Sequence, residues 1–145
     1  MKLIYKVLLA LAITGITVFL YVFVLLINKG HIDYSKAKAD YTISAEALYN
    51  DFKTNKTEAQ TKYTGKVVEL TGAISKIENI ADTAKVVVFV FSEDDFGDAG
   101  VRCLILPAFI KDLSAYSAGN DVKIKGFCSG YDETDVKLDN CSIIK

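Results

Sequence analysis

A stretch of alternating side chains near the middle of the chain constrains the fold most. From Tyr63 to Ile77 the sequence is YTGKVVELTGAISKI, in which an apolar residue or glycine stands at every second position from Val68 to Ile74. Period-two patterning rich in β-branched residues predicts a strand with one face on a core. Gly72 predicts a bend or bulge within that strand, because mid-strand glycines commonly mark such places; a glycine in a flat edge strand would give the same pattern.

The segments on either side of this strand show a regular order of elements. Before it, residues 45–53 carry apolar side chains at helical spacing, with Thr42 or Ser44 as the N-cap, and Asn55 followed by Glu58 favours a second short helix. After it, strands are predicted over 85–91, 101–106, 121–128 and 135–144, with an acidic turn over 92–100 and a helix over 108–117. Strand-strand-strand-helix-strand-strand is the order of the OB-fold. We therefore predict an all-β domain with flanking helices, a five-stranded OB-fold barrel (β-β-β-α-β-β) preceded by an N-terminal helix and a single transmembrane helix.

The N-terminus carries the strongest composition signal. Val7–Ile27 contains 21 residues without a charge, between Lys6 and Lys29. A helix of this length spans about 30 Å, the thickness of a hydrocarbon core. A cleaved signal peptide is the alternative, but it would have a shorter apolar run and a small-residue cleavage site, so an uncleaved signal anchor is favoured. Lys2 and Lys6 favour a cytoplasmic N-terminus.

These features predict a single-pass protein of the cytoplasmic (inner) membrane with its C-terminal domain outside the cytoplasm. The expected parts are a short cytoplasmic N-terminus (1–6), a transmembrane signal anchor (7–27), a juxtamembrane linker (28–41) and the OB-fold domain (42–145). Three of the 17 basic residues and none of the 18 acidic ones lie in the first 30 residues, which leaves 14 basic against 18 acidic residues for the rest. Nucleic-acid-binding domains are commonly basic, so nucleic acid is a less favoured partner.

Several short motifs between residues 41 and 145 resemble a known family. They are Ser44-Ala-Glu-Ala-Leu, Ala59, Tyr63-x-Gly65-Lys66, Thr71-Gly72, Val101-Arg-Cys103, Gly119-x-x-Val122-x-Ile124-Lys-Gly126-x-Cys128-x-Gly130 and Val136-x-Leu138-x-Asn-Cys141. This set is similar to bacterial tRNA-anticodon-like OB-fold proteins, mostly small envelope or lipoprotein domains. The resemblance implies the fold, and it implies nucleic-acid binding by analogy of fold alone. The chain departs from the lipoprotein members, because no cysteine precedes Cys103.

The strands over 85–91 and 101–106 are apolar on both sides, so both of their faces need a cover. One face belongs to the core, and the other is covered by the helices of residues 44–63 or stays open for a ligand. OB-folds commonly bind ligands on this surface, where an outward Phe89 or Phe91 would stack a base or a sugar. A row of Lys123, Lys125 and Lys137 is either a basic contact surface or an ordinary solvated face. The candidate binding residues are Lys85, Phe89, Phe91, Tyr131, Lys123 and Lys125.

Three cysteines in an oxidising compartment suggest one disulfide and one free thiol. Cys128 and Cys141 lie on the two arms of one predicted hairpin and form the first candidate pair; Cys103 with Cys141 is the second, and three free thiols are the third possibility. No metal site is expected, because there is no C-x-x-C motif and no second histidine. A loose Ca²⁺ site on the acidic residues of 93–98 is a weak alternative to a solvated turn, since their spacing is not that of a calcium loop.

The sequence offers no catalytic set, since its one histidine, His31, lies in the linker. We therefore expect no enzyme and no cofactor. The predicted function is a membrane-anchored, non-enzymatic OB-fold binding module of the bacterial envelope, which interacts with a protein or another envelope component. Oligonucleotide or oligosaccharide binding through the face of the second and third strands is one alternative, and a structural domain without a ligand is another.

Overall fold

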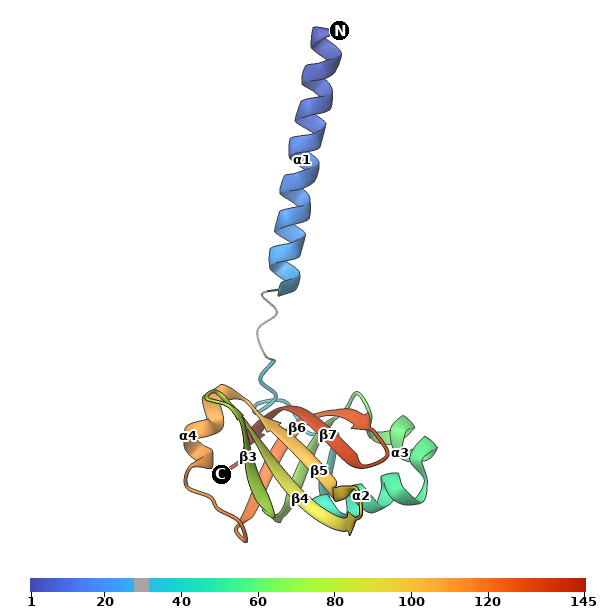
Figure 1. Ribbon diagram of the computed structural model, residues 1–145, viewed down its shortest axis with the longest axis vertical. Coiled ribbons are helices and arrows are strands. Elements are labelled where there is room, and N and C mark those ends of the chain that lie inside the picture. The colour runs from blue at the N-terminus through green and yellow to red at the C-terminus, as the bar shows by residue number, and fades with distance from the viewer. Residues whose placement is uncertain (28–31) are drawn as a thin grey trace. The chain divides into compact units, whose positions relative to one another are not determined.

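The computed structural model describes residues 1–27 and 32–145, and it divides into two compact units, Met1–Ile32 and Asp33–Lys145 (Figure 1). The first unit is the helix α1 (Lys2–Ile27). No residue of its apolar window is buried, and the helix is long and apolar enough to cross a membrane. A signal sequence passes the same test of length and composition.

The second unit is built on one mixed sheet of seven strands. The chain order is β1 (Tyr41–Ser44), α2 (Ala45–Thr54), α3 (Lys56–Tyr63), β2 (Val67–Ala73), β3 (Lys76–Ala81), β4 (Ala84–Asp94), β5 (Gly97–Ile105), the 3₁₀ turn η1 (Pro107–Phe109), α4 (Ile110–Leu113), β6 (Asp121–Tyr131) and β7 (Asp135–Ile143). The strands lie in the order β1-β2-β6-β7-β5-β4-β3. The pairs β1–β2 and β5–β7 are parallel, and the other neighbours are antiparallel.

The predicted first strand is divided in two. β2 pairs with β6 and β3 pairs with β4, and only Ile74 and Ser75 separate them in the chain. The break therefore falls after Gly72, which keeps a regular register opposite Val122. Gly72 instead lets the Phe89 ring pack closely against the backbone, because a Cβ at this position would lie 3.3 Å from that ring. The predicted sheet-rich domain with flanking helices is confirmed. Within the described residues no ladder joins β2 to β3, so the predicted closed barrel of five strands is not confirmed.

Two further segments differ from the prediction. The acidic turn expected over 92–100 is mostly strand, because the β4–β5 ladder continues to the pair Asp94 and Gly97. Gly97 has a φ of +123°, which allows the chain to reverse within two residues. The helix expected over 108–117 is short, since η1 and α4 end at Leu113.

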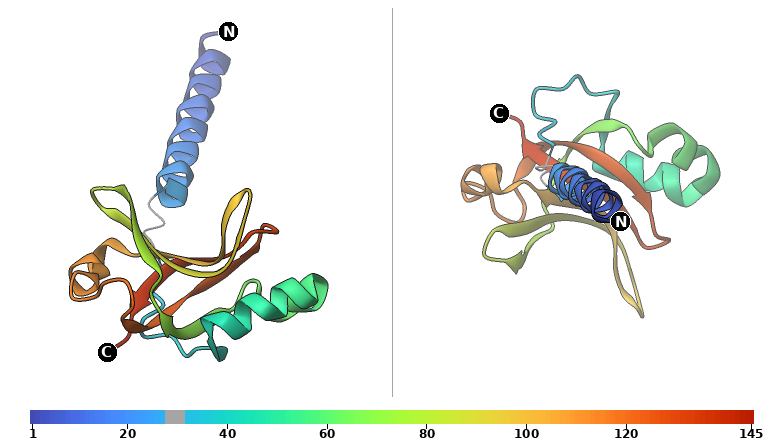
Figure 2. Two further views of the ribbon diagram at one scale, coloured as in Figure 1. Left: turned by 60° about the horizontal axis from the view of Figure 1, so that its bottom comes forward. Right: turned by 90° about the horizontal axis from the view of Figure 1, so that it is seen from above.

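The helices α2 and α3 pack on the core side of the sheet. Ser44 Oγ caps α2 by accepting a hydrogen bond from Ala47 N at 3.2 Å, as predicted. Leu48 and Phe52 on α2 belong to the same buried cluster as Val87 and Phe89 on β4. Figure 1 shows α2 and α3 at one end of the curved sheet and α4 at the other, and Figure 2 shows the same arrangement from two more directions. The helices therefore pack against the inner face, and of the two alternatives for the outer face the structure does not show cover by α2 and α3.

The part of the expected linker that follows Ile32 lies against the domain. Tyr34 stacks on Phe127 with ring centroids 5.6 Å apart, and Lys125 Nζ donates to the carbonyl oxygens of Ser35 and Ala37 at 3.3 and 3.1 Å. Tyr41, the last residue of the predicted linker, begins β1, which pairs with β2. Residues 28–31, including His31, lie outside the described residues.

Candidate binding surface

Aromatic side chains from β4 and β6 pack on aromatic side chains of α2 at one end of the sheet. We call Tyr49, Phe91 and Tyr131 the aromatic rim. Tyr49 and Phe91 have ring centroids 5.7 Å apart, and Tyr131 packs on Phe52 at 5.5 Å. Phe91 is 38 % exposed and Tyr131 is half-buried, whereas Tyr49 is buried. The rim is an apolar surface held from below by the core.

Phe91 reaches the rim because the β4–β5 ladder is irregular there. The register shifts between Val90 and Ser92, which leaves Phe91 without a ladder partner, as in a β-bulge. Phe89, two residues earlier, is fully buried in the core opposite Val101. Of the two candidate phenylalanines, Phe91 is therefore available to a ligand and Phe89 is not.

Two lysines flank the aromatic rim. Lys53 Nζ lies 5.6 Å from the centroid of Tyr49, and Lys56 Nζ lies 5.9 Å from that of Tyr131. Lys56 also bridges Glu133 at 2.9 Å, so its charge is already partly balanced. Burial raises the pKa of Tyr131, so its hydroxyl stays protonated at neutral pH and donates to the Glu133 carbonyl oxygen at 2.8 Å. The surface is mainly apolar, with a weak positive margin.

The outer face of β3, β4 and β5, where the sequence predicted ligand binding, is covered by ion pairs. Val86 and Val88 point to this face and are buried, and they lie opposite Glu78 and Lys76 on β3. Arg102 on β5 lies opposite Val88, so the two valines have charged residues on both neighbouring strands. Lys76 bridges Asp98 at 2.6 Å and Glu78 at 3.0 Å; Arg102 bridges Glu78 and Asp135, both at 2.7 Å. Charged side chains, with their apolar stems over the valines, supply the cover that the helices do not.

The other predicted binding residues lie apart from the rim and are engaged with acidic partners or at a turn. Lys123 and Lys125 both face Glu69 at 3.8 Å. Lys137 bridges Asp132 at 2.6 Å. Lys85 is half-buried near the β3–β4 turn, beside a shallow hollow lined by Asn79, Ile80, Ala81 and Asp82. Of the predicted set, Phe91 packs on Tyr49 and Tyr131 packs on Phe52, both on α2, whereas among the described residues no such contact with α2 rings joins Lys85, Lys123 or Lys125 to them.

The rim and its two flanking lysines include residues that the sequence did not identify. Tyr49, Lys53 and Lys56 come from α2 and α3, which had been considered only as packing helices. Tyr49 and Lys53 are four residues apart, the spacing at which helical side chains meet. That spacing is a usable signal, but it does not say that β4 and β6 supply the remaining aromatic side chains.

Cys103, Cys128 and Cys141 are free thiols, and all three are fully buried. Cys128 lies opposite Leu138 on β7, so the expected alignment of Cys128 with Cys141 across the hairpin is not found. Burial raises the pKa of Cys128 to about 11 and that of Cys141 well above its usual value, so both are protonated and inert as nucleophiles.

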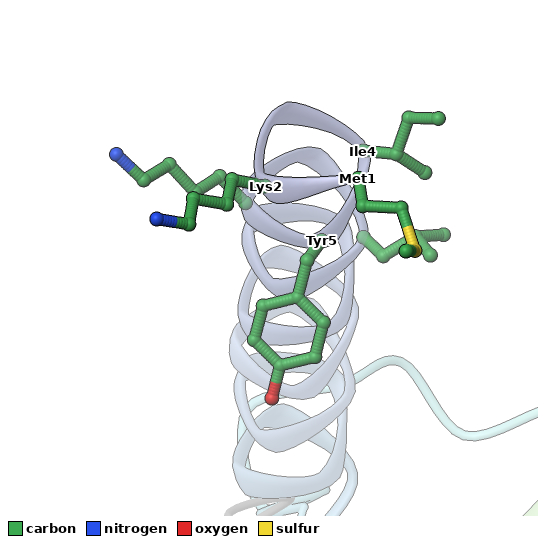
Figure 3. A pocket seen from close by; sticks show the side chains of 6 residues that line it. Met1, Lys2, Ile4 and Tyr5 are labelled. Carbon is green, nitrogen blue, oxygen red and sulfur yellow. The ribbon is translucent and has the colours of Figure 1, made fainter.

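Two hollows of the described chain do not offer a better site. A polar pocket of about 220 Å³ between α2 and α3 is lined by Asp51, Thr54, Asn55, Glu58, Ala59, Lys62 and Tyr63. It is small for an organic ligand, and Tyr63 already donates to Asp51 at 2.6 Å. A hollow at the start of α1 is the outside of a single helix, with Lys2 on one side and Met1 and Ile4 on the other (Figure 3).

Clusters of metal-ligating side chains and buried polar side-chain atoms without a partner are likewise absent from the part of the chain that the structure describes. Within residues 1–27 and 32–145, no group of three His, Cys, Asp or Glu side chains could hold a metal ion. Over the same residues, every buried side-chain nitrogen or oxygen has a hydrogen-bond partner. The aromatic rim is therefore the site that the geometry favours.

Comparison with solved structures supports the fold. The chain is similar to a lipoprotein from Klebsiella pneumoniae subsp. pneumoniae MGH 78578 for which nucleic-acid binding has been put forward. The two share 24 % identity over 72 % of this chain and 91 % of that one, with a TM-score of 0.56. This likeness concerns the fold alone, because identity is low.

Other similarities are weaker. OBody AM1L10, solved bound to hen egg-white lysozyme, is 17 % identical over 57 % of this chain and 82 % of its own, with a TM-score of 0.39. The S. pombe Stn1–Ten1 complex is 14 % identical over 55 % and 58 %, with a TM-score of 0.36. No curated protein matches the sequence.

The predicted family resemblance is confirmed at the level of sequence. A model of the family described as tRNA_anti-like matches residues 1–143, which is nearly the whole chain. The chain therefore belongs to the tRNA_anti-like family.

Proposed function

We propose that the chain is a membrane-tethered, non-enzymatic binding module that holds a protein or another envelope component through its aromatic rim. In this proposal α1 is an uncleaved anchor in the cytoplasmic membrane, and residues 33–145 work outside the cytoplasm. The observation that carries the proposal is the pair of accessible aromatic side chains, Phe91 and Tyr131, supported from beneath by Tyr49 and Phe52. Rigid aromatic side chains at the centre of an interface commonly supply much of its binding energy.

The charges near the rim favour a ligand that is uncharged, or that carries both signs of charge, over a polyanion. The lysines expected to attract phosphates face Glu69 or Asp132, and Lys56 at the rim faces Glu133. A ligand with many negative charges would have to displace these carboxylates. A protein surface or a neutral envelope polymer would not.

The proposal includes a closed barrel. β3 lies at one end of the strand order and β2 lies next to the other end, where β1 stands, although β2 and β3 are consecutive in the chain. Ser75 N, in the two-residue connection between them, donates to Val88 O at 2.9 Å. We infer that β2, Ile74, Ser75 and β3 act as one sharply bent first strand, which would make this sheet a variant of the five-stranded OB barrel.

The test is quantitative capture from the native membrane. The full chain is solubilised in mild detergent together with the membrane components bound to it. Wild type is compared with the double variant Phe91→Ala, Tyr131→Ala. We expect at least one co-purified component to fall tenfold or more, because two interface aromatics together contribute about 2 kcal/mol or more. Lys111→Ala, an exposed residue on α4, is the matched control and should leave capture unchanged. Equal capture by the double variant and wild type would refute the proposal.

Single-stranded nucleic acid is the second candidate ligand, favoured by one observation. Lys53 and Lys56 lie within 6 Å of rim aromatics, which is the combination that stacks bases and neutralises phosphates. If two lysines contact phosphates, a plot of the logarithm of the binding constant against the logarithm of the salt concentration should have a slope of about −1.4. Fluorescence anisotropy of a labelled oligonucleotide at low salt tests this. Binding with that slope, lost in Lys53→Gln, would replace the protein ligand by nucleic acid.

A further inference from the structure

The segment that precedes β1 is fastened to the domain at both of its ends. At its start, the ring of Tyr34 stacks on that of Phe127 on β6, with centroids 5.6 Å apart and planes 15° from parallel. At its end, Asp40 and Val67 bond to each other twice. Asp40 N donates to Val67 O at 2.7 Å, and Val67 N donates to Asp40 Oδ2 at 2.9 Å. We call residues 33–40 the clamp.

One lysine holds the middle of the clamp. Lys125 Nζ donates to Ser35 O at 3.3 Å and to Ala37 O at 3.1 Å, and the lysine side chain is only 12 % exposed. An ammonium group buried to this extent needs acceptors, because a buried charge without them is costly. Lys125 and Phe127 stand two residues apart on β6. The clamp is therefore part of the folded domain and not a free tether.

The clamp shortens the free chain between α1 and the domain. α1 ends at Ile27, so seven residue steps lead to Tyr34, and these span at most about 25 Å. If the chain were held only from β1 onwards, fourteen steps would lead from Ile27 to Tyr41, with a span of about 50 Å. These upper limits follow from the covalent chain alone. The clamp halves the length of the free tether.

The clamp also lies near the aromatic rim, because both contact β6. Phe127 under the clamp and Tyr131 in the rim are four residues apart on this strand, which is about 13 Å. A segment packed on a sheet lies about 10 Å from it. The tether therefore lets the rim at Tyr131 reach at most about 50 Å from the point where α1 ends.

The accessible part of the rim is small, so a contact made by it alone is weak. Phe91 is 38 % exposed, Tyr131 is half-buried and Tyr49 is buried. A short tether gives a partner confined to the same membrane an effective concentration in the millimolar range. At that concentration a weak contact is occupied. A partner that diffuses freely in solution gains nothing from the tether.

The charges near the rim disfavour the lipid surface itself. Glu133 follows Tyr131 by two residues and has a side chain that is 80 % exposed, and Glu93, two residues after Phe91, is also exposed. Residues 31–145 carry 14 basic and 18 acidic residues. Anionic headgroups attract clusters of basic side chains and repel acidic ones. A protein surface with basic side chains beside an apolar patch fits better.

We propose that the aromatic rim binds a protein held in the same membrane as α1, and that the clamp keeps the rim within reach of this partner. The inference rests on the proposed function for the rim as contact surface and for α1 as anchor, and it adds where the partner lies. The partner presents an apolar patch within about 50 Å of the membrane, with basic side chains that face Glu93 and Glu133.

The test is to lengthen the tether. A photoreactive phenylalanine analogue replaces Phe91 in the full chain in its native membrane, and about 30 Gly and Ser residues are inserted between Lys29 and Gly30. The free tether becomes about five times longer, and effective concentration falls as about the −3/2 power of tether length. We expect the yield of the cross-linked partner to fall about tenfold. The matched control carries the same added residues after Lys145 and should keep the yield of the original chain.

Opening the clamp gives an intermediate tether. The double variant Tyr34→Ala, Lys125→Met doubles the free length, so the yield of the cross-linked partner should fall about threefold. Lys123→Met is the matched control, because Lys123 faces Glu69 at 3.8 Å as Lys125 does, and its hydrogen bonds to the clamp are absent within the described residues. The insertion lies outside the domain, so it decides the question even if the double variant unfolds.

The identity of the cross-linked partner separates this inference from the proposed function. The partner should stay in the membrane after an alkaline carbonate wash. A partner released by the wash, a cross-link to lipid, or a yield that the insertion leaves unchanged would overturn the inference and keep the rim as the contact surface. No cross-link from position 91 in any of the chains would overturn both.

Discussion

Removing the Phe52 ring tests whether α2 is part of the core. Phe52 is fully buried, and its centroid lies 5.9 Å from that of Tyr63 and 5.5 Å from that of Tyr131. Truncating a buried phenylalanine to alanine commonly costs about 3–5 kcal/mol. Each aromatic pair adds about 0.5–1.5 kcal/mol beyond simple burial, so we expect about 4 kcal/mol for Phe52→Ala. For a domain of about 110 residues this lowers the melting temperature by about 15 °C.

The assay is a urea titration of the full chain in mild detergent. The chain has eight tyrosines and no tryptophan, so tyrosine fluorescence reports the unfolding of the domain. Phe91→Ala is the matched control, because Phe91 is 38 % exposed and its truncation should cost about 2 kcal/mol, half the loss expected for Phe52→Ala. A loss below 1 kcal/mol for Phe52→Ala, or equal losses for the two variants, would refute the placement of α2 in the core.

Two carboxylates give further predictions. Asp135 accepts hydrogen bonds from Gly100 N at 3.0 Å and from Arg102 Nε at 2.7 Å. Asp135→Ala should lower the free energy of unfolding by about 2–3 kcal/mol in the same urea titration, because it leaves a buried N–H unpaired. An unchanged urea midpoint would contradict this. Burial raises the pKa of the Asp132 carboxyl, but hydrogen bonds from Lys137 and two backbone N–H groups lower it by more, to about 2 from 3.8. Because the folded pKa is depressed, the stabilisation by Asp132 is present above about pH 4 and is lost as the pH falls through 2. Asp132→Asn should melt below wild type at pH 7, and the gap should close between pH 4 and pH 2; a gap independent of pH would contradict the assignment.

Sequence patterns predicted the elements better than their junctions. The period-two stretch around Val68 and the helical spacing of Leu48 and Phe52 gave correct elements, because each pattern reports which side of a local segment is buried. The break at Ile74 and Ser75 escaped prediction. It depends on β2 and β3 pairing with different strands far along the chain.

The same limit explains the candidate site. The run of apolar residues in β4 could not show which phenylalanine points inward, because a strand that is apolar on both sides carries no period. The bulge that turns Phe91 to the rim depends on its register with β5. The acidic partners of Lys123 and Lys125 are likewise set by the pairing of β2 with β6, which places Glu69 opposite Lys125.

The most direct test of the binding proposal is photo-crosslinking in the native membrane. A photoreactive phenylalanine analogue replaces Phe91 in one full-length variant and Lys111 in another. We predict a discrete cross-linked species from position 91 that is absent from position 111 and is suppressed when Tyr131→Ala is added. No adduct from position 91, or the same adducts from both positions, would contradict the proposal that the aromatic rim is the contact surface.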